Sequence, residues 1–146
     1  MGDAARIITA LDSAGYRLTG PRRALADLVA DRAGSTFTAA DLVADVRARC
    51  LSIGRATVFR AIELMVSVGV VERVDLQSGE HAYVECVPTH HHHVICSRCA
   101  RATDIGDLGL GAVAREVARR TGYRIDEHRL ELFGLCPDCQ RATAPA

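Results

Sequence analysis

Two Cys-x-x-Cys pairs constrain the C-terminal half of this chain more strongly than any other feature. The first pair is Cys96 and Cys99, and the second is Cys136 and Cys139. A Cys-x-x-Cys turn brings two sulfurs close enough to share one tetrahedral ion, and a second turn completes the ligand set. Four thiolates leave no coordination position open for a substrate. We therefore expect a structural zinc site that ties the start of this half to its end.

Other uses of the six cysteines fit the sequence less well. Residues 1–12 show no basic region followed by an apolar stretch, so no secretory signal is visible and metal chemistry is favoured over disulfides. A thioredoxin-like dithiol would lie in a βαβ pattern, which surrounds neither pair. A redox switch in which oxidation releases zinc stays open as an alternative. Cys50 has no partner in the sequence, and we expect it to be a small buried apolar residue.

Four consecutive histidines, residues 90–93, precede the first cysteine pair. If this segment is extended, its side chains alternate, so one strand can serve two separate metal sites. His91 and His93 would face one side, and His90 and His92 the other. Cys86 could join either site. The candidate carboxylate ligands are Glu72, Glu80, Glu85, Asp104 and Asp107, and the remaining histidines are His81 and His128.

The N-terminal half has the periodicity of a helix-turn-helix followed by a hairpin. Thr19, with Pro21 after it, can begin one helix, and Thr38 can begin another. The segment 51–54 would join the latter to a helix over residues 55–68, whose apolar stripe includes Val58 and Ile62. After Gly69 the period changes, and residues 70–75 and 82–84 are typical of two strands around a turn. Together these elements predict a winged helix-turn-helix.

The C-terminal half is expected to mix helix and strand. An amphipathic pattern predicts a helix over residues 108–121, and alternation predicts a strand over residues 123–133. The fold class is therefore α+β. We expect a winged helix-turn-helix domain over residues 1–86 and a small α/β domain with the four-cysteine zinc site over residues 87–146.

The charge pattern allows a basic face although the formal net charge is zero. Every basic residue other than histidine is arginine, which reads phosphate and guanine better than lysine does. No acid lies between Asp45 and Glu63. No apolar run is long enough for a transmembrane helix, so we expect a cytoplasmic protein with no membrane partner. The arginines fall into two clusters: Arg17, Arg22 and Arg23, then Arg47, Arg49, Arg55 and Arg60.

Four stretches in a fixed order carry a resemblance to a known family. They are residues 18–22 (Leu-Thr-Gly-Pro-Arg), 56–60 (Ala-Thr-Val-Phe-Arg), 90–99 (four His, then Val-Ile-Cys-Ser-Arg-Cys) and 128–134 (His-Arg-Leu-Glu-Leu-Phe-Gly). Over nearly its full length the chain resembles the ferric uptake regulator family of bacterial metal-dependent repressors. The resemblance implies a winged helix, a C-terminal dimerisation domain, a homodimer and double-stranded operator DNA as partner. An enzyme is not expected: a zinc deaminase would need a His-x-Glu motif, which is missing, and a proline where Leu135 stands.

Within the family, the zinc uptake regulator branch is the most similar. The segment in which iron and peroxide sensors usually carry a histidine is Ser-Thr-Phe-Thr here, residues 35–38. A thiolate in the sensory site also suits zinc better than ferrous iron. We therefore expect zinc-dependent repression, with iron, manganese, nickel or peroxide sensing as the alternative. The resemblance implies a sensory zinc on Glu72, Cys86, His91 and His93, and an additional site on His90, His92 and His128.

Two departures from the family pattern affect these expectations. Gly111 stands where the additional site has a glutamate, so that site would be three-coordinate plus water, completed by Asp104 or Asp107, or degraded. Phe59 stands where tyrosine is common, which removes one hydroxyl. The resemblance implies DNA contacts from Arg17, Arg55, Thr57, Phe59 and Arg60. Because Val58 and Ile62 must face the core, Arg55 and Phe59 are better placed for bases and Arg60 for phosphate.

Overall fold

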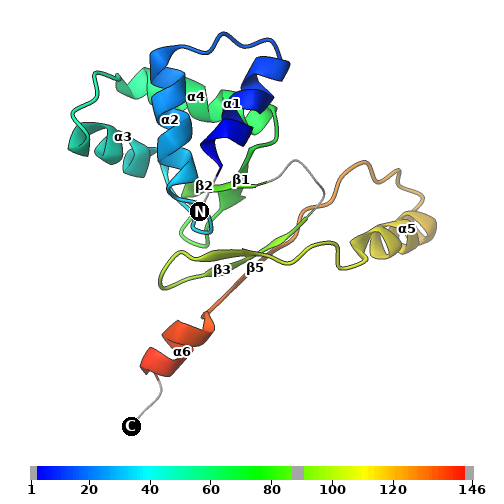
Figure 1. The fold of residues 1–146 in the computed structure, drawn as a ribbon. Helices are drawn as coiled ribbons and strands as arrows, with labels where there is room; N and C mark the ends of the chain where they lie inside the picture. Colours follow the sequence, from blue (N-terminus) through cyan, green and yellow to red (C-terminus); the bar gives the residue numbers. More distant parts are fainter. Residues whose placement is uncertain (1–2, 87–90, 144–146) are drawn as a thin grey trace. The chain divides into compact units, whose positions relative to one another are not determined.

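The computed structural model describes residues 3–86 and 91–143 of the chain. These residues belong to two compact units, Met1–Pro88 and Thr89–Ala146. The domain boundary expected after residue 86 borders on residues 87–90, which lie outside the described part, as does His90. The first unit is mostly helical, and the second is built on a three-stranded sheet (Figure 1).

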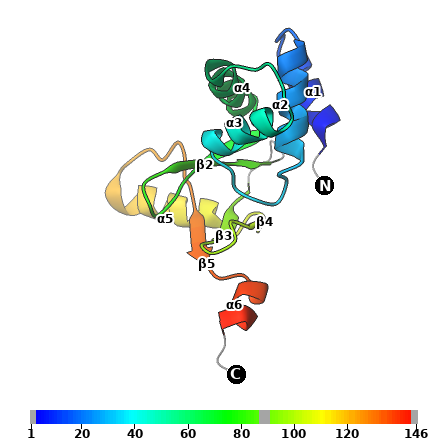
Figure 2. The ribbon, with the colours of Figure 1, turned by 90° about the vertical axis from the view of Figure 1, so that its left-hand side faces the viewer.

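Four helices and a hairpin form the first unit. Its elements are α1 (Ala4–Ser13), α2 (Gly20–Ala30), α3 (Ala39–Ala48), α4 (Arg55–Ser67), β1 (Val71–Asp75) and β2 (His81–Glu85). Apolar side chains of all four helices meet in one core, which Val70, Val71 and Tyr83 of the hairpin region also contact. The two strands are antiparallel, with Val71 opposite Glu85. In two views, the helices lie on one side of the hairpin (Figures 1 and 2).

Helix starts in this unit follow local capping chemistry. At α3, the Thr38 hydroxyl accepts the Asp41 N–H at 3.1 Å, and the Asp41 carboxylate accepts the Thr38 N–H at 2.7 Å. This reciprocal pair satisfies two backbone donors that the helix itself leaves without partners. At α2, the Thr19 hydroxyl accepts the Arg22 N–H at 3.4 Å, and Pro21 occupies the first turn. The helix starts expected at Thr19 and Thr38 are confirmed.

Helices α3 and α4 and the hairpin β1–β2 give the winged helix-turn-helix that the sequence predicts. Val58 and Ile62 are buried, as expected for the inner face of α4. One expectation was wrong: Cys50 is exposed rather than buried. Its φ of 53° lies in the left-handed region directly after α3, and the Leu51 N–H donates to the Val46 carbonyl at 3.0 Å. Cys50 thus takes the helix-ending position that glycine usually occupies, and its side chain is exposed to solvent.

A small sheet with the strand order β4-β3-β5 organises the second unit. The central strand β3 runs antiparallel to β4 and parallel to β5, so that Ile95 lies between Ala102 and Phe133. The parallel pair joins segments from the beginning and the end of the unit. The elements are β3 (His93–Cys96), β4 (Ala102–Asp104), α5 (Leu110–Thr121), β5 (Glu131–Gly134) and α6 (Pro137–Thr143). The predicted α+β class is confirmed.

The end of the second unit differs from expectation. The strand expected over residues 123–133 is confined to β5, and residues 122–130 form neither helix nor strand. Residues 122–127 are all exposed, so the alternating pattern has no apolar layer to pack against within the unit. The short helix α6 follows β5 in a segment where no helix was expected.

Little apolar surface is buried in the second unit. Among its described residues, the buried apolar side chains are Ile95, Cys96 and Ala102. Helix α5 has no buried residue, and Val113 and Val117 are 58% and 43% exposed. A core this small rarely holds a fold together without a metal ion or a partner chain.

Candidate metal centres and nucleic-acid interface

The four cysteines of the two Cys-x-x-Cys pairs come together in the second unit. Cys96 ends β3, and Cys136 follows β5, which is paired in parallel with β3. The pairing continues beyond the strands, because the Ser97 N–H donates to the Gly134 carbonyl at 2.8 Å. Strand pairing therefore sets the two cysteine turns side by side. The ligand sulfurs of Cys96, Cys99, Cys136 and Cys139 all lie within 4.8 Å of one another, a grouping that could hold one zinc ion.

The sulfur cluster creates two opposite shifts of thiol pKa. Backbone N–H groups of Cys136, Cys99 and Arg98 point at Cys96 and lower its pKa to about 6. The hydrogen bond that the Cys139 thiol shares with Cys136, together with burial, raises the pKa of Cys139 to about 12. At neutral pH, Cys96 is therefore a thiolate that can bind metal directly, whereas Cys139 is a thiol that must lose its proton to bind metal.

The histidine segment presents its rings to different neighbours. The rings of His91 and His93 meet edge to face, with centroids 4.7 Å apart. The ring of His92 lies instead 5.6 Å from that of His128. The alternation expected from the sequence is therefore visible over residues 91–93, whereas His90 lies outside the described part. His92 and His93 are buried, so both lie in a protected environment.

Glu72 and Cys86 both belong to the hairpin of the first unit. Glu72 lies opposite Val84, and residues 84 and 86 share a face of the sheet because side chains alternate along a strand. The structure therefore places Glu72 and Cys86 on one face of the hairpin. Glu85, another candidate carboxylate, points to the opposite face and forms an ion pair with Arg6. His91 and His93, the other members of the expected sensory set, belong to the second unit.

The region of the expected additional site carries a hollow beside Gly111. The hollow has a volume of about 250 Å³ and is lined by Gly111, Arg115 and His128, among others. A Cβ added at Gly111 would lie 3.5 Å from the Arg115 guanidinium. An arginine thus lies beside the place where the family has a carboxylate. Asp104 and Asp107, the carboxylates considered as replacements, accept the N–H groups of Gly106 and Gly109, each at 2.8 Å.

The start of α4 presents arginines without nearby acids. Its first turn contains no acidic residue, and its N-cap, Gly54, makes no side-chain cap. The Arg55 guanidinium lies over the Phe59 ring, 5.4 Å from its centroid. Phe59 is 37% exposed, Arg60 is also exposed, and Thr57 is half-buried. Because a helix N-terminus carries partial positive charge, this end of α4 is suited to a polyanion.

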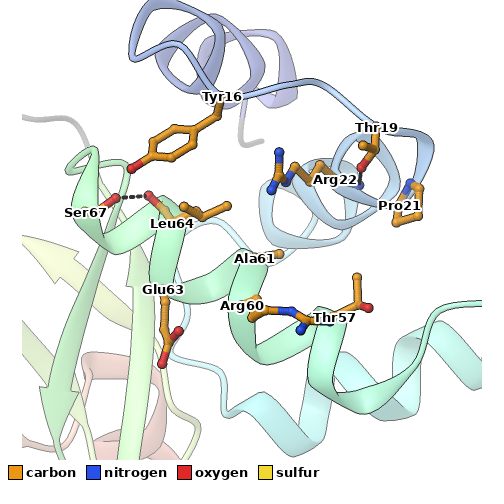
Figure 3. A pocket seen from close by; sticks show the side chains of 10 residues that line it. All are labelled: Tyr16, Thr19, Pro21, Arg22, Thr57, Arg60, Ala61, Glu63, Leu64 and Ser67. Carbon is orange, nitrogen blue, oxygen red and sulfur yellow. Dashed lines mark hydrogen bonds between the residues drawn. The ribbon is translucent and has the colours of Figure 1, made fainter.

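A hollow of about 550 Å³ lies between α2, α4 and the connection after α1 (Figure 3). Arg22 lines it from α2, Thr57 and Arg60 from α4, and Tyr16 from the connection. Arg22 also donates from Nη1 to the carbonyl of Arg17, which holds that exposed loop in place. Arg22 belongs to the first arginine cluster of the sequence, where it carries no expected contact of its own. It lies in the first turn of α2, where the helix dipole disfavours a cation.

Comparisons with known proteins place these features in a family. The sequence profile of the ferric uptake regulator family matches residues 13–133. A ferric uptake regulation protein of Neisseria meningitidis is 30% identical over 133 residues, which cover 91% of this chain and 92% of the relative. A zinc uptake regulation protein of Mycobacterium tuberculosis is 35% identical over 130 residues, which cover 89% of this chain and 99% of the relative.

Solved structures share the fold. A zinc uptake regulator complexed with zinc and DNA matches with a TM-score of 0.78 and 24% identity, over 95% of this chain and 93% of that one. Among the described residues, no helix has both the length and the apolar character needed to cross a bilayer. The family match confirms the resemblance seen in the sequence. The chain belongs to the ferric uptake regulator family, whose members are metal-responsive transcriptional regulators and not enzymes.

Proposed function

We propose that the chain is a zinc-responsive repressor that binds operator DNA as a homodimer when it is loaded with zinc. The observation that carries the choice of metal is the Cys86 thiol, which shares a face of the hairpin with Glu72. Thiolate ligands favour zinc over ferrous iron. Similarity to the Mycobacterium tuberculosis zinc uptake regulation protein supports zinc, and similarity to the Neisseria meningitidis ferric uptake regulation protein supports iron as the alternative.

Two kinds of metal site would serve different purposes. The four-cysteine cluster would hold a structural zinc, which supplies a cross-link to a unit with a small core. Glu72, Cys86, His91 and His93 would hold the sensed zinc. A third site on His90, His92 and His128 would be weaker, because Gly111 supplies no carboxylate and Arg115 lies beside it.

The proposed sensory ligands come from both units. Zinc would act on DNA binding by connecting these two units. Glu72 and Cys86 belong to the DNA-binding unit, and His91 and His93 to the other. Residues held on one ion restrict how the two units move relative to each other. In a dimer, this restriction would set the spacing of the two α4 helices, which must match a groove repeat of about 34–36 Å or a related geometry. A coupling free energy of about 1–3 kcal/mol is typical of such control.

The DNA contacts would centre on α4. Arg55 and Phe59 are exposed at its start and are placed to reach base edges. Arg60 and Arg22, which line one hollow, would hold a backbone phosphate between α4 and α2. Thr57 lines the same hollow and would add a hydroxyl donor, whereas Arg17 would enter the minor groove.

The dimer contact would use the exposed apolar side of the second unit. Leu108, Val113 and Val117, along and before α5, are between 43% and 58% exposed. Val113 and Val117 are four residues apart, one helical turn, on a helix with no buried residue of its own. A second copy of the chain would cover this face and enlarge the small core.

An operator-binding titration at controlled free zinc tests the proposal. Cys86→Ala should need a much higher free zinc concentration than wild type for half-maximal DNA binding. Cys50→Ala, which changes an exposed cysteine of the same unit, should behave as wild type. If Cys86→Ala binds DNA like wild type at every free zinc concentration, the sensory assignment is wrong. Restoring DNA binding to metal-free protein with zinc, iron(II), manganese(II) or nickel(II) separates zinc sensing from its alternatives.

A further inference from the structure

The end of β2 is tied to the N-terminal helix by one arginine. Arg6, in α1, forms an ion pair from Nη2 with the Glu85 carboxylate. Its Nη1 donates to the backbone carbonyl of Cys86 at 2.8 Å. The Arg6 side chain is 27% exposed and that of Glu85 only 8%, so the pair is largely shielded from water. Hydrogen bonds from a charged donor are stronger than those between neutral groups.

Cys86 lies one residue beyond the end of β2, and the hydrogen bond from Arg6 is one of several that hold its backbone in place. The Cys86 N–H donates to the Val70 carbonyl at 3.0 Å, and its Sγ contacts the Gly69 carbonyl at 3.6 Å. With Arg6 on the carbonyl, both backbone polar groups of Cys86 are engaged. Without these contacts, a residue just past the last pair of a hairpin would be mobile. Ordering it when the metal ion binds would then cost conformational entropy and weaken metal binding.

Arg6 is itself held on a rigid support. Its neighbour Ile7 and the other buried residue of α1, Leu11, are 0% and 1% exposed in the helical core. The Arg6 N–H also donates to the Asp3 side chain that caps α1. The same core contains Val58 and Ile62 of α4. Arg6 therefore links the backbone carbonyl of Cys86 to the helical bundle that contains α4.

We propose that Arg6 is a positioning residue for the sensory metal site: its contacts with Glu85 and Cys86 hold the thiol-bearing backbone in the arrangement that binds the ion. This inference rests on the proposed sensory role of Cys86. It assigns Glu85 to the support of the site, as the partner that orients Arg6, and not to metal binding.

Zinc affinity measured on the full-length protein tests this role. With the four-cysteine site loaded, competition with a chromogenic chelator should show Arg6→Gln binding the second zinc about 5- to 30-fold more weakly than wild type, the factor expected when one residue must be ordered on binding. Glu85→Gln should produce a smaller loss, because Arg6 can still donate to the Cys86 carbonyl. Arg6→Lys should recover part of the affinity, since an ammonium can reach one partner but lacks the fork of donors.

Arg32→Gln provides a matched control. Arg32 pairs with Asp45 in the same unit, at 2.7 and 3.0 Å, and its side chain is 29% exposed, close to the value for Arg6. Both substitutions should lower the urea midpoint of unfolding, but only Arg6→Gln should weaken zinc binding by the folded protein. Equal zinc affinity in Arg6→Gln and wild type, or equal losses in Arg6→Gln and Arg32→Gln, would overturn the positioning role.

Cys86→Ala, measured in parallel, distinguishes this proposal from the one it rests on. If Cys86→Ala retains wild-type affinity for the second zinc, the sensory site itself is misassigned and the positioning role falls with it. If Cys86→Ala loses the second zinc while Arg6→Gln keeps it, the site stands and only the role of Arg6 is refuted.

Discussion

The substitution Cys136→Ser should unfold the second unit while leaving the first intact. Cys96 and Cys136 are 40 residues apart in the chain, so an ion held by both closes a long loop. By the loop-entropy relation used for disulfides, a cross-link over a loop of this length stabilises a fold by about 4 kcal/mol. Loss of one of four sulfurs weakens the hold on the ion and removes most of this contribution.

The apolar core of the second unit is too small to compensate for the loss of the zinc cross-link. Among its described residues, only Ile95, Cys96 and Ala102 bury apolar side chains, and one of these is itself a predicted ligand. Single cores of small domains rarely supply more than about 3–5 kcal/mol. Subtracting about 4 kcal/mol therefore leaves a unit with almost no net stability.

Hydrogen exchange followed by mass spectrometry can measure this loss of stability of the second unit in the zinc-loaded full-length protein. Amides of the paired strands β3 and β5, such as those of Val94 and Leu132, should exchange up to about a thousandfold faster in Cys136→Ser, since 1.4 kcal/mol corresponds to a factor of ten. Peptides from α1 to α4 should be unaffected. Cys50→Ser is the control, because it changes an exposed cysteine outside the cluster. Wild-type protection of β3 and β5 in Cys136→Ser would refute the cross-link argument.

Three other changes have expected outcomes. Cys50→Gly should raise the free energy of unfolding of the first unit by up to about 1 kcal/mol, because glycine adopts the φ of 53° without strain; urea denaturation followed by circular dichroism measures it. Thr38→Ala should lower the same quantity by about 1 kcal/mol through loss of the capping box, and an unchanged midpoint would contradict this. Zinc affinity of the sulfur cluster should fall as pH falls, by about tenfold per unit for each proton released on binding. Cys139, with its raised pKa of about 12, is protonated in the metal-free cluster at neutral pH, and Cys96 is protonated as well below about pH 6. Chelator competition between pH 5.5 and 8 should therefore show a plot of log zinc affinity against pH that becomes steeper toward the acid end. A zinc affinity that does not change with pH would contradict this prediction.

Elements of the first unit could be predicted because their ends are set by residues close together in the sequence. The Thr38 and Asp41 side chains that begin α3 are three residues apart. The burial of Val58 and Ile62 follows from helical spacing alone. Cys50 was misjudged because residue type predicts burial only on average, whereas its position at the end of α3 imposes a backbone geometry that exposes the side chain.

The second unit was harder to predict because its strands depend on distant partners. Strand β5 exists where it pairs with β3, and the alternating residues before it have no such neighbour. The cysteine grouping could nevertheless be anticipated, since the spacing within each turn is local. The contact of Arg6 with Cys86 could not, because it joins residues 80 positions apart and is made to a backbone carbonyl, which no residue pattern marks.

Strand β3 is four residues long, with His93 at one end and Cys96 at the other. Four strand residues span only about 10 Å. An imidazole expected to follow the changing supply of zinc therefore shares a backbone segment with a sulfur expected to keep its ion permanently. Loss of the permanent ion, through oxidation of its thiolate ligands or through strong chelators, would therefore also loosen the strand that carries His93. Under thiol stress, the proposed sensory site would then lose zinc affinity even when the zinc supply is adequate.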